Sequence, residues 1–212
     1  MRVIIVRHGQ TPHNREGRFR GLLDVPLDDT GQEQARRSAA FLRQALGVGR
    51  SSGSLALHTG PLARTRQTAA PLAADLGIAA TPLDELNDVD VGLWQGVLIA
   101  EVAEREPLAY QSWTEHPAVF RFPGGDSLAD IHERSANLLA KLVLGEAPGD
   151  DRDIVLYTHQ VPAKLLVAAA LGLGPEAFWR LRVDNAAVSV LERERGRFAL
   201  TLFNATAHLS ML

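Results

Sequence analysis

The segment Val3-Ile4-Ile5-Val6-Arg7-His8-Gly9-Gln10-Thr11 decides how the rest of the chain is interpreted. Its first four residues are branched and apolar without a polar break, which is typical of a strand buried on both faces of a parallel sheet. The polar residues that follow therefore stand at the carboxyl end of a central strand, where open α/β sheets bind their ligands. An arginine and a histidine at that edge suit a phosphate, because Arg7 can donate to its oxygens while His8 attacks phosphorus.

The same pattern returns far along the chain. Ile154-Val155-Leu156-Tyr157-Thr158 is a second apolar strand, and it ends directly before His159. A helix is expected to follow at once, because Pro162 is well suited to a first helical turn. The sequence therefore predicts two histidines, each at the carboxyl end of a buried strand.

The composition is that of an ordinary globular protein and bounds the function classes. With 212 residues, 46% of them hydrophobic, the chain is expected to form one domain over residues 1–212. A net charge of −3 argues against a nucleic-acid partner. We expect no membrane contact, because no run of 18 apolar residues and no signal peptide occurs. The lack of cysteine excludes disulfides and fits a reducing cytoplasm, which is the expected location.

Helical and alternating patterns follow one another along the chain, and this order predicts an α/β protein. A helix is expected to begin at Thr30 as N-cap, with Glu33 completing a capping box, after a polar loop at 13–29. Pro71 is expected to kink or restart the helix that contains it. Further helices are expected at 62–69, 97–106, 108–115, 128–142, 161–171 and 175–181. Strands are expected at 3–6, 55–58, 79–83, 154–158, 188–192 and 198–202, with loops at 47–54 and 145–152. The tail at 204–212 has no predicted structure.

These motifs resemble those of the histidine phosphatase superfamily, also called the phosphoglycerate mutase-like family. Arg7-His8-Gly9, followed by Asn14, is similar to its Arg-His-Gly signature, and the helix at 62–69 is similar to its second phosphate-binding motif. The resemblance runs from the first strand to the final hairpin. It implies a three-layer α/β/α sandwich, with a mostly parallel central sheet and helices on both faces.

The resemblance also implies a role for each matching residue. His8 is expected to be the nucleophile that forms a phosphohistidine, and its cationic neighbours are expected to keep it unprotonated. Arg7, Arg64 and His159 are expected to hold the phosphoryl oxygens and to take part in catalysis. Further contacts to the phosphate or substrate are expected from Asn14, Gln10, Thr11, Gly21 and Gln160.

We expect neither a metal ion nor a cofactor, because the positive side chains supply the charge that a metal would bring. The alternative interpretation is that His8 and His159 bind a metal ion. The sequence offers no third carboxylate or histidine at ligand spacing for such a site.

The general acid is expected at Asp88, where the family usually has glutamate. Aspartate is one methylene shorter, and a misplacement of about 1 Å can cost on the order of 10²-fold in rate. Glu85 and Asp90 are therefore alternatives for the acid. Two further departures from the family pattern are Gln95, at a position that is often acidic, and Gln160, where glycine is usual.

The segment around 97–125 is expected to be an insertion. Its aromatic residues, together with Trp94, suit a lid over the site. They suit an ordinary hydrophobic core equally well. The residues alone do not choose between the two.

The favoured function is a phosphomonoester hydrolase of the phosphatase branch that acts on small phosphorylated metabolites. One alternative is a cofactor-dependent phosphoglycerate mutase, although Asn87-Asp88-Val89 stands where the family mutases have Asn-Glu-Arg. The other alternative is a catalytically weak or inactive member that only binds phosphorylated ligands, for which Asp88, Gln95 and Gln160 are the support. The sequence leaves open the substrate and the oligomeric state, a homodimer included.

Overall fold

The computed structural model describes residues 1–49, 55–144 and 152–210. Within them, six strands form one sheet in the order β3-β2-β4-β1-β5-β6. Strands β3, β2, β4 and β1 are parallel, and the hairpin β5-β6 is antiparallel to β1. The strands are β1 (Arg2–Arg7), β2 (Leu55–Thr59), β3 (Thr81–Pro82), β4 (Asp153–Thr158), β5 (Val188–Glu194) and β6 (Arg197–Ala205).

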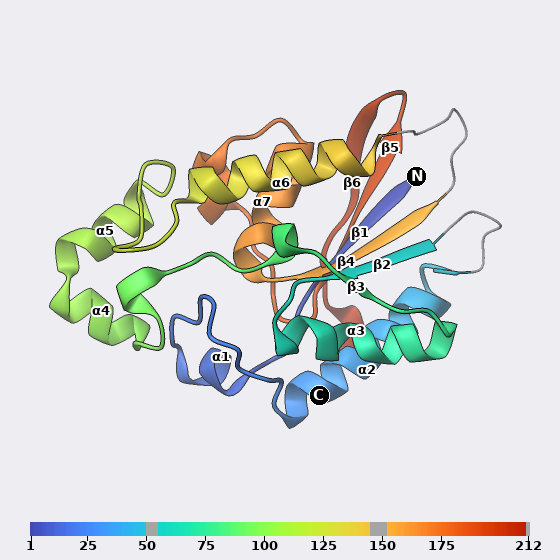
Figure 1. Cartoon of the computed structure of the whole chain (residues 1–212), viewed down its shortest axis with the longest axis horizontal. Coiled ribbons are helices and arrows are strands. Elements are labelled where there is room, and N and C mark those ends of the chain that lie inside the picture. The colour runs from blue at the N-terminus through green and yellow to red at the C-terminus, as the bar shows by residue number, and fades with distance from the viewer. Residues whose placement is uncertain (50–54, 145–151, 211–212) are drawn as a thin grey trace.

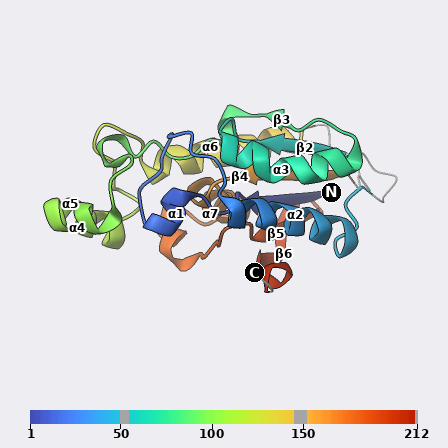
Figure 2. The same cartoon turned by 90° about the horizontal axis from the view of Figure 1, so that it is seen from below.

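Helices cover both faces of this sheet (Figures 1 and 2). The α-helices are α1 (Pro12–Glu16), α2 (Asp29–Gln44), α3 (Ala63–Leu76), α4 (Ile99–Arg105), α5 (Pro107–Glu115), α6 (Leu128–Leu142) and α7 (Gln160–Ala170). Short 3₁₀ helices are η1 (Asp84–Leu86), η2 (Gly92–Trp94), η3 (Pro175–Arg180) and η4 (Ala207–Leu209). None of the helices within the described residues has the length and apolar character needed to cross a bilayer.

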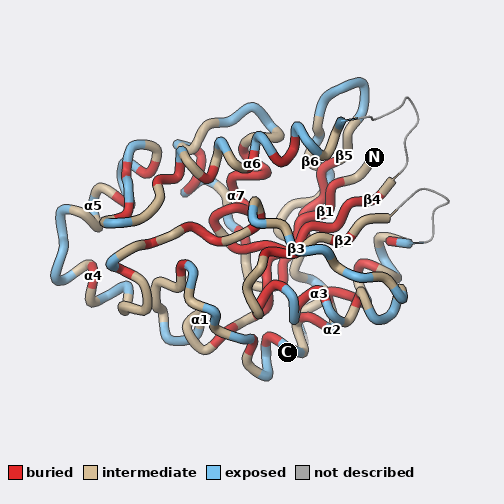
Figure 3. The backbone as a smooth tube through the Cα atoms, viewed as in Figure 1, coloured by how far each residue is buried: buried red, intermediate tan, exposed pale blue. Residues whose placement is uncertain are grey.

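The alternation of side chains along β1 builds the two interior layers. Val3 and Ile5 pack with residues of α6 and α7, whereas Ile4 and Val6 pack with residues of α2 and α3. All four are nearly inaccessible to solvent, which confirms the prediction of a strand buried on both faces. Figure 3 shows this buried band running along the central strands. The three-layer α/β/α fold is therefore confirmed.

The register brings the ends of β1 and β4 together. Arg7 lies opposite Thr158, so the residues that follow each strand, His8 and His159, leave the sheet side by side. Figure 1 shows these strands running toward the end of the molecule where α1, α4 and α5 lie.

Several sequence-based boundaries were wrong. Helix α2 begins one residue before Thr30, because the carboxylate of Asp28 accepts the backbone N–H of Gly31 at 2.8 Å and acts as the N-cap. The predicted loop at 13–29 contains helix α1, which Thr11 caps. Helix α3 continues through Pro71, so of the two predicted alternatives the restart is wrong. The predicted loops at 47–54 and 145–152 lie largely outside the described residues.

The tail is ordered as far as it is described. Strand β6 extends to Ala205, and the following turn η4 places His208 against α2. The His208 ring stacks on Phe41 with centroids 4.8 Å apart, and its Nε2 lies 3.1 Å from Ser38 Oγ. The tail therefore closes the α2 face of the sheet. The predicted capping box of Ser127 and Asp130 at the start of α6 is confirmed.

Candidate active site

His8 is held in one orientation and one tautomer at the end of β1. Its backbone N–H donates to Thr158 O at 2.9 Å, and its Nδ1 lies 2.7 Å from the carbonyl of Gly9. Because a carbonyl can only accept, Nδ1 must carry the hydrogen, and Nε2 is left with a free lone pair. That Nε2 is buried and has no hydrogen-bond partner among the described residues. Burial, reinforced by His159 and Arg64, holds the pKa of His8 well below its ordinary value, so the ring is neutral.

His159 is fixed in the opposite tautomer. Its ring centroid lies 5.2 Å from that of His8, and its Nδ1 accepts a hydrogen bond from Arg64 Nε at 3.0 Å. In the neutral ring, Nε2 must therefore carry the hydrogen, and this N–H is also buried without a partner. Burial lowers the pKa of His159 to about 3, although Asp88 opposes the shift. One free lone pair and one free donor thus stand close together.

Asp88 lies beside Arg64 and the ring of His159. Its Oδ2 is 3.1 Å from Arg64 Nη2 and 3.5 Å from His159 Nδ1. Burial alone would raise the pKa of this carboxyl, but the neighbouring His159, Arg64 and Arg20 hold the pKa below its ordinary value. The carboxylate is therefore ionised in the empty site.

The two alternative acids occupy other positions. Glu85 forms an ion pair with Lys141 at 2.6 Å. Asp90 accepts the backbone N–H of Gly92 at 2.9 Å, which shapes the loop that follows. Of these three carboxylates, Asp88 is the one that lines the cavity described below.

The two predicted arginines differ in how many of their donors are free. Arg7 donates from Nη1 to Val183 O at 2.6 Å, and its buried Nε has no partner in the part of the chain that the structure describes. Burial, with Arg20 adding to it, lowers the pKa of Arg7 to about 9. Arg64 is fully buried, and its donors reach Leu23 O at 2.6 Å and Gly21 O at 2.8 Å besides His159 and Asp88.

Three of the remaining predicted residues lie in the loop after His8 and in helix α1. The Thr11 hydroxyl donates to Asn14 Oδ1 at 2.8 Å and caps α1, so it is used within the loop. Asn14 Oδ1 also accepts the N–H of Thr11, which leaves the amide nitrogen of Asn14 as its outward donor. The backbone N–H of Gln10 donates to Gln34 Oε1 at 2.7 Å.

Gly21, Gln95 and Gln160 border the cavity or support it. Gly21 adopts a φ of +52°, and a Cβ there would lie 2.7 Å from Gln95 Oε1. That same oxygen accepts the N–H of Leu22 at 2.8 Å, so Gln95 ties two loops together. Gln160 is the first residue of α7 and lines the cavity.

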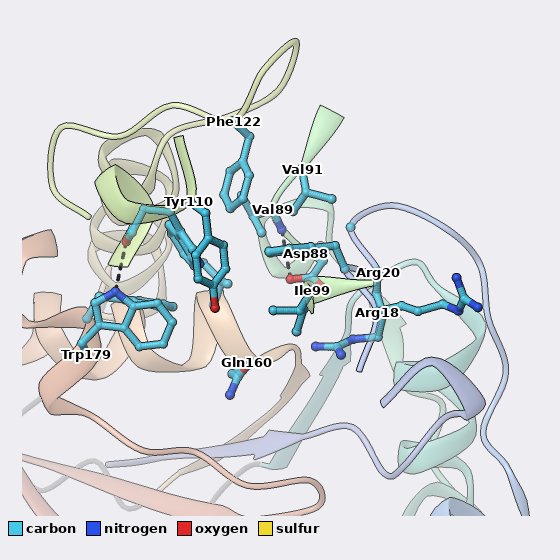
Figure 4. Close-up of a pocket in the computed structure, with 15 residues that line it drawn as sticks. Arg18, Arg20, Asp88, Val89, Val91, Ile99, Tyr110, Phe122, Gln160 and Trp179 are labelled. Atoms are coloured by element: carbon cyan, nitrogen blue, oxygen red, sulfur yellow. Dashed lines mark hydrogen bonds between the residues drawn. The ribbon is translucent and has the colours of Figure 1, made fainter. Parts of the chain in front are cut away.

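A cavity of ≈160 Å³ opens beside Asp88 (Figure 4). Arg20 and Asp88 lie on one side of it, and Tyr110 and Trp179 lie across it. The indole N–H of Trp179 donates to the carbonyl of Trp113 at 3.1 Å, which fixes that wall. The segment 97–125 supplies four of the lining residues, namely Ile99, Tyr110, Trp113 and Phe122. Trp113 and Phe122 also belong to a buried aromatic cluster, so these rings serve both the core and the cavity wall.

Three residues of the site were not predicted from the sequence. Arg20 lines the cavity, its Nε is buried without a partner, and its side chain makes no hydrogen bond or ion pair within the described residues. Asn185 Nδ2 donates to the carbonyls of His8 at 3.2 Å and Gly9 at 3.3 Å. Arg134 donates from α6 to Asn87 O at 2.5 Å and so holds the acidic loop. Only Arg20 carried a usable signal, because it directly precedes Gly21 in a motif already identified.

The charges of the site favour an anion. Arg7, Arg20 and Arg64 face a single carboxylate, Asp88, while both histidines are neutral. A phosphoryl dianion would balance this excess and meet the free donors. Within the described ranges, no group of three or more His, Asp or Glu residues is placed to hold a metal ion.

Comparison with known proteins agrees with this geometry. Residues 3–206 match the model of the histidine phosphatase superfamily, branch 1. The chain is 32% identical over 210 residues to phosphoserine phosphatase 1 of Hydrogenobacter thermophilus, covering 99% of this chain and 94% of that protein. It is also 32% identical to glucosyl-3-phosphoglycerate phosphatase of Mycobacterium tuberculosis, covering 99% of this chain and 96% of that one. The structure of a mycobacterial glucosyl-3-phosphoglycerate phosphatase with VO3 superposes with a TM-score of 0.83, covering 97% of this chain and 99% of the other. The chain therefore belongs to branch 1 of the histidine phosphatase superfamily.

Proposed function

We propose that the chain cleaves phosphomonoesters by transferring the phosphoryl group first to His8 and then to water. The family and the phosphatase names of its relatives make the chain a phosphomonoester hydrolase with a small phosphorylated substrate. They do not favour the mutase alternative. What we add is the assignment of roles to individual residues.

In the first step the lone pair on His8 Nε2 attacks phosphorus, and the bond from phosphorus to the ester oxygen breaks. The Nε2–H of His159 and the free donors of Arg7 hold the non-bridging oxygens as charge shifts. Asp88 gives a proton to the departing alkoxide. In the second step Asp88 takes a proton from water, the water oxygen attacks phosphorus, and the bond to His8 breaks to release phosphate.

The single observation that carries this assignment is the pair of opposite tautomers. His8 presents a lone pair that receives no hydrogen bond and His159 presents an N–H, on rings whose centroids are 5.2 Å apart. Nucleophilic attack on a phosphoryl group needs one of each: an electron pair aimed at phosphorus and a donor aimed at its oxygens.

The cavity beside Asp88 is the proposed place for the leaving group. Its volume of ≈160 Å³ suits a group of modest size, and its walls are largely apolar and aromatic. The segment 97–125 would act as the lid over this group. The relatives act, by their names, on phosphoserine and on glucosyl-3-phosphoglycerate, so serine and glycerate esters belong in the first substrate panel.

The test is a screen of phosphate release from a panel of small phosphate esters, with His8→Ala as the blank. We expect release by the wild type, no release by His8→Ala, and acid-labile labelling of the wild type after a brief exposure to a ³²P-labelled ester. Binding of phosphate without any turnover or labelling would contradict the proposal. That outcome would identify an inactive member that only binds phosphorylated ligands.

A further inference from the structure

The cavity beside Asp88 has a charged side and an aromatic side (Figure 4). Arg20 and Asp88 lie on the charged side, and Tyr110 and Trp179 lie across the cavity from them. The other rings that line the cavity belong to Phe19, Trp113, Phe122 and Phe178. A leaving group whose oxygen is next to Asp88 therefore extends over aromatic surface.

The rings of the aromatic side hold one another in place. The ring centroid of Trp113 lies 5.3 Å from that of Phe178 and 5.2 Å from that of Trp179. The hydrogen bond from the Trp179 indole to the Trp113 carbonyl fixes the same pair. Because this surface is formed before a ligand arrives, a flat ring can pack on it with little loss of side-chain freedom.

The positive charges near the aromatic side are already engaged. Lys164 is 4% exposed, and its Nζ lies 4.1 Å from the ring centroid of Phe178 and 5.0 Å from that of Trp179. Lys164 does not line the cavity, so its ammonium stabilises the two rings from outside it. Arg18 lines the cavity but forms an ion pair with Glu16 at 2.6 Å. Among the described residues, the aromatic side therefore offers no free cation to a carboxylate on the leaving group.

The size and exposure of the cavity suit one ring. Its volume is ≈160 Å³. An apolar protein cavity of about 150 Å³ can hold benzene. Trp179 is 48% exposed, whereas its neighbour Trp113 is 6% exposed. A large apolar side chain left half exposed beside a cavity indicates a surface that a ligand covers. Tyr110 and Gln160 add a hydroxyl and an amide to the lining, and both groups are neutral.

We propose that the preferred substrates are phosphomonoesters whose leaving group carries an uncharged aromatic ring, which packs on Tyr110, Trp113 and Trp179. This inference rests on the proposed function and narrows its substrate class. Serine and glycerate esters, which carry charge and no ring, are then cleaved slowly by comparison.

The first test compares kcat/KM among alkyl phosphates. Benzyl phosphate is expected to exceed phosphoserine and 3-phosphoglycerate by roughly 10- to 100-fold, since it buries a ring where the other two would bury charge. It should exceed cyclohexylmethyl phosphate, which has a similar size without the π system, by about 2- to 10-fold. A charged ester cleaved as fast as benzyl phosphate, or equal values for the two ring esters, would overturn the proposal.

The second test removes a ring from the aromatic side. Trp179→Leu should reduce the preference for benzyl phosphate over glycerol 3-phosphate by about 3- to 10-fold, whereas Trp179→Phe keeps a ring and should retain most of it. Leu108→Ala is the matched control, because Leu108 is an exposed apolar residue of α5 that does not line the cavity. A preference that Trp179→Leu leaves unchanged would contradict the proposal. Should Trp179→Leu fold poorly by thermal melting, Tyr110→Leu gives the same decision.

Phosphonates keep this inference apart from the proposed function, because their bond from phosphorus to carbon is not hydrolysed. Isothermal titration calorimetry should show benzylphosphonate binding at least about 10-fold more tightly than methylphosphonate. Equal affinities would overturn the aromatic site and leave the hydrolase mechanism standing. A protein that binds benzylphosphonate tightly yet releases phosphate from no ester would refute the mechanism and support the aromatic site.

Discussion

Asp88 is ionised in the empty site, although a general acid must carry a proton. The proton can come with the substrate, because a phosphomonoester binds its second proton with a pKa near 6. Once the phosphoryl group is bound, its negative charge offsets the arginines that hold the pKa of Asp88 down. Asp88 thus receives its proton from the substrate on which it then acts. The shorter aspartate is accommodated by the contact with Arg64, which holds Oδ2 near the imidazole of His159.

Replacing Asp88 with Asn tests this role through the leaving group. Phosphate release from an alkyl ester such as glycerol 3-phosphate should fall by about 10²- to 10⁴-fold. Release from p-nitrophenyl phosphate should fall much less, because that leaving group departs without a proton. The control is Asp90→Asn, which keeps an oxygen for the Gly92 N–H. Equal losses in the two variants, or equal losses for both esters, would show that Asp88 is not the acid.

At the scale of elements, the loop after β1 and the start of α2 approach too closely for any side chain. A Cβ on Gly31 would stand 2.0 Å from the carbonyl oxygen of Gln10, and one on Gly9 would stand 2.5 Å from the carbonyl oxygen of Gly31. Helix α2 therefore fixes the backbone that carries His8. Helix α6 does the same for the acid, through the hydrogen bond from Arg134 to Asn87 O.

The variant Gly31→Ala should force this loop away from the helix. We expect the free energy of unfolding to fall by about 1–3 kcal/mol, the usual range for overpacking. We expect kcat/KM to fall as well, because His8 moves with the loop. Urea denaturation and phosphate-release assays measure the two effects. Gln32→Ala, at the next and exposed position of α2, should change neither. A fully active and stable Gly31→Ala protein would show that the contact is not constraining.

The elements that could be predicted are those whose structure is determined by residues close together in the sequence. The two buried strands follow from unbroken apolar runs, and the capping box of Ser127 follows from four adjacent residues. The start of α2 was misjudged because Asp28 and Thr30 are both good N-caps, and only the contact with the loop at Gln10 favours the earlier one. Helix α1 was missed because a five-residue helix has too little periodicity to detect.

At the scale of the whole molecule, the site is assembled from segments far apart in sequence. The positions of His8, Arg64 and His159 could be predicted because each follows or begins a recognisable element. Asn185 could not, because its contact with the carbonyl of His8 depends on the pairing of β5 with β1. That the Arg20 side chain makes no hydrogen bond to any described residue could not be predicted either, since a sequence does not show which donors are already used.

Burying neutral histidines makes stability depend on pH. In the unfolded chain a histidine binds a proton below about 6.5, whereas His159 in the folded protein does so only near pH 3. The unfolded state therefore binds more protons in between, and stability falls as the pH is lowered through this window. His159 contributes about 1.4 kcal/mol per pH unit, and the lowered pKa of His8 acts in the same direction.

Urea unfolding at pH 7, 6 and 5 measures this dependence. His159→Gln should reduce the slope of stability against pH by about 1.4 kcal/mol per unit below pH 6. His116→Gln, at an exposed position of the segment after α5, is the control and should leave the slope unchanged. A wild-type slope that His159→Gln does not alter would mean that His159 is protonated in the folded state.

The carbonyl of His8 is bound by the backbone N–H of Ala186 at 3.1 Å and by the Asn185 side chain, both from just before the final hairpin. The proposed nucleophile follows strand β1, yet its backbone is held by residues that lie more than 170 positions later in the sequence. During synthesis, the active site can therefore be completed only after the segment at Asn185 and the strands that follow it have docked. Competence to turn over substrate should accordingly appear late in folding, together with completion of the sheet.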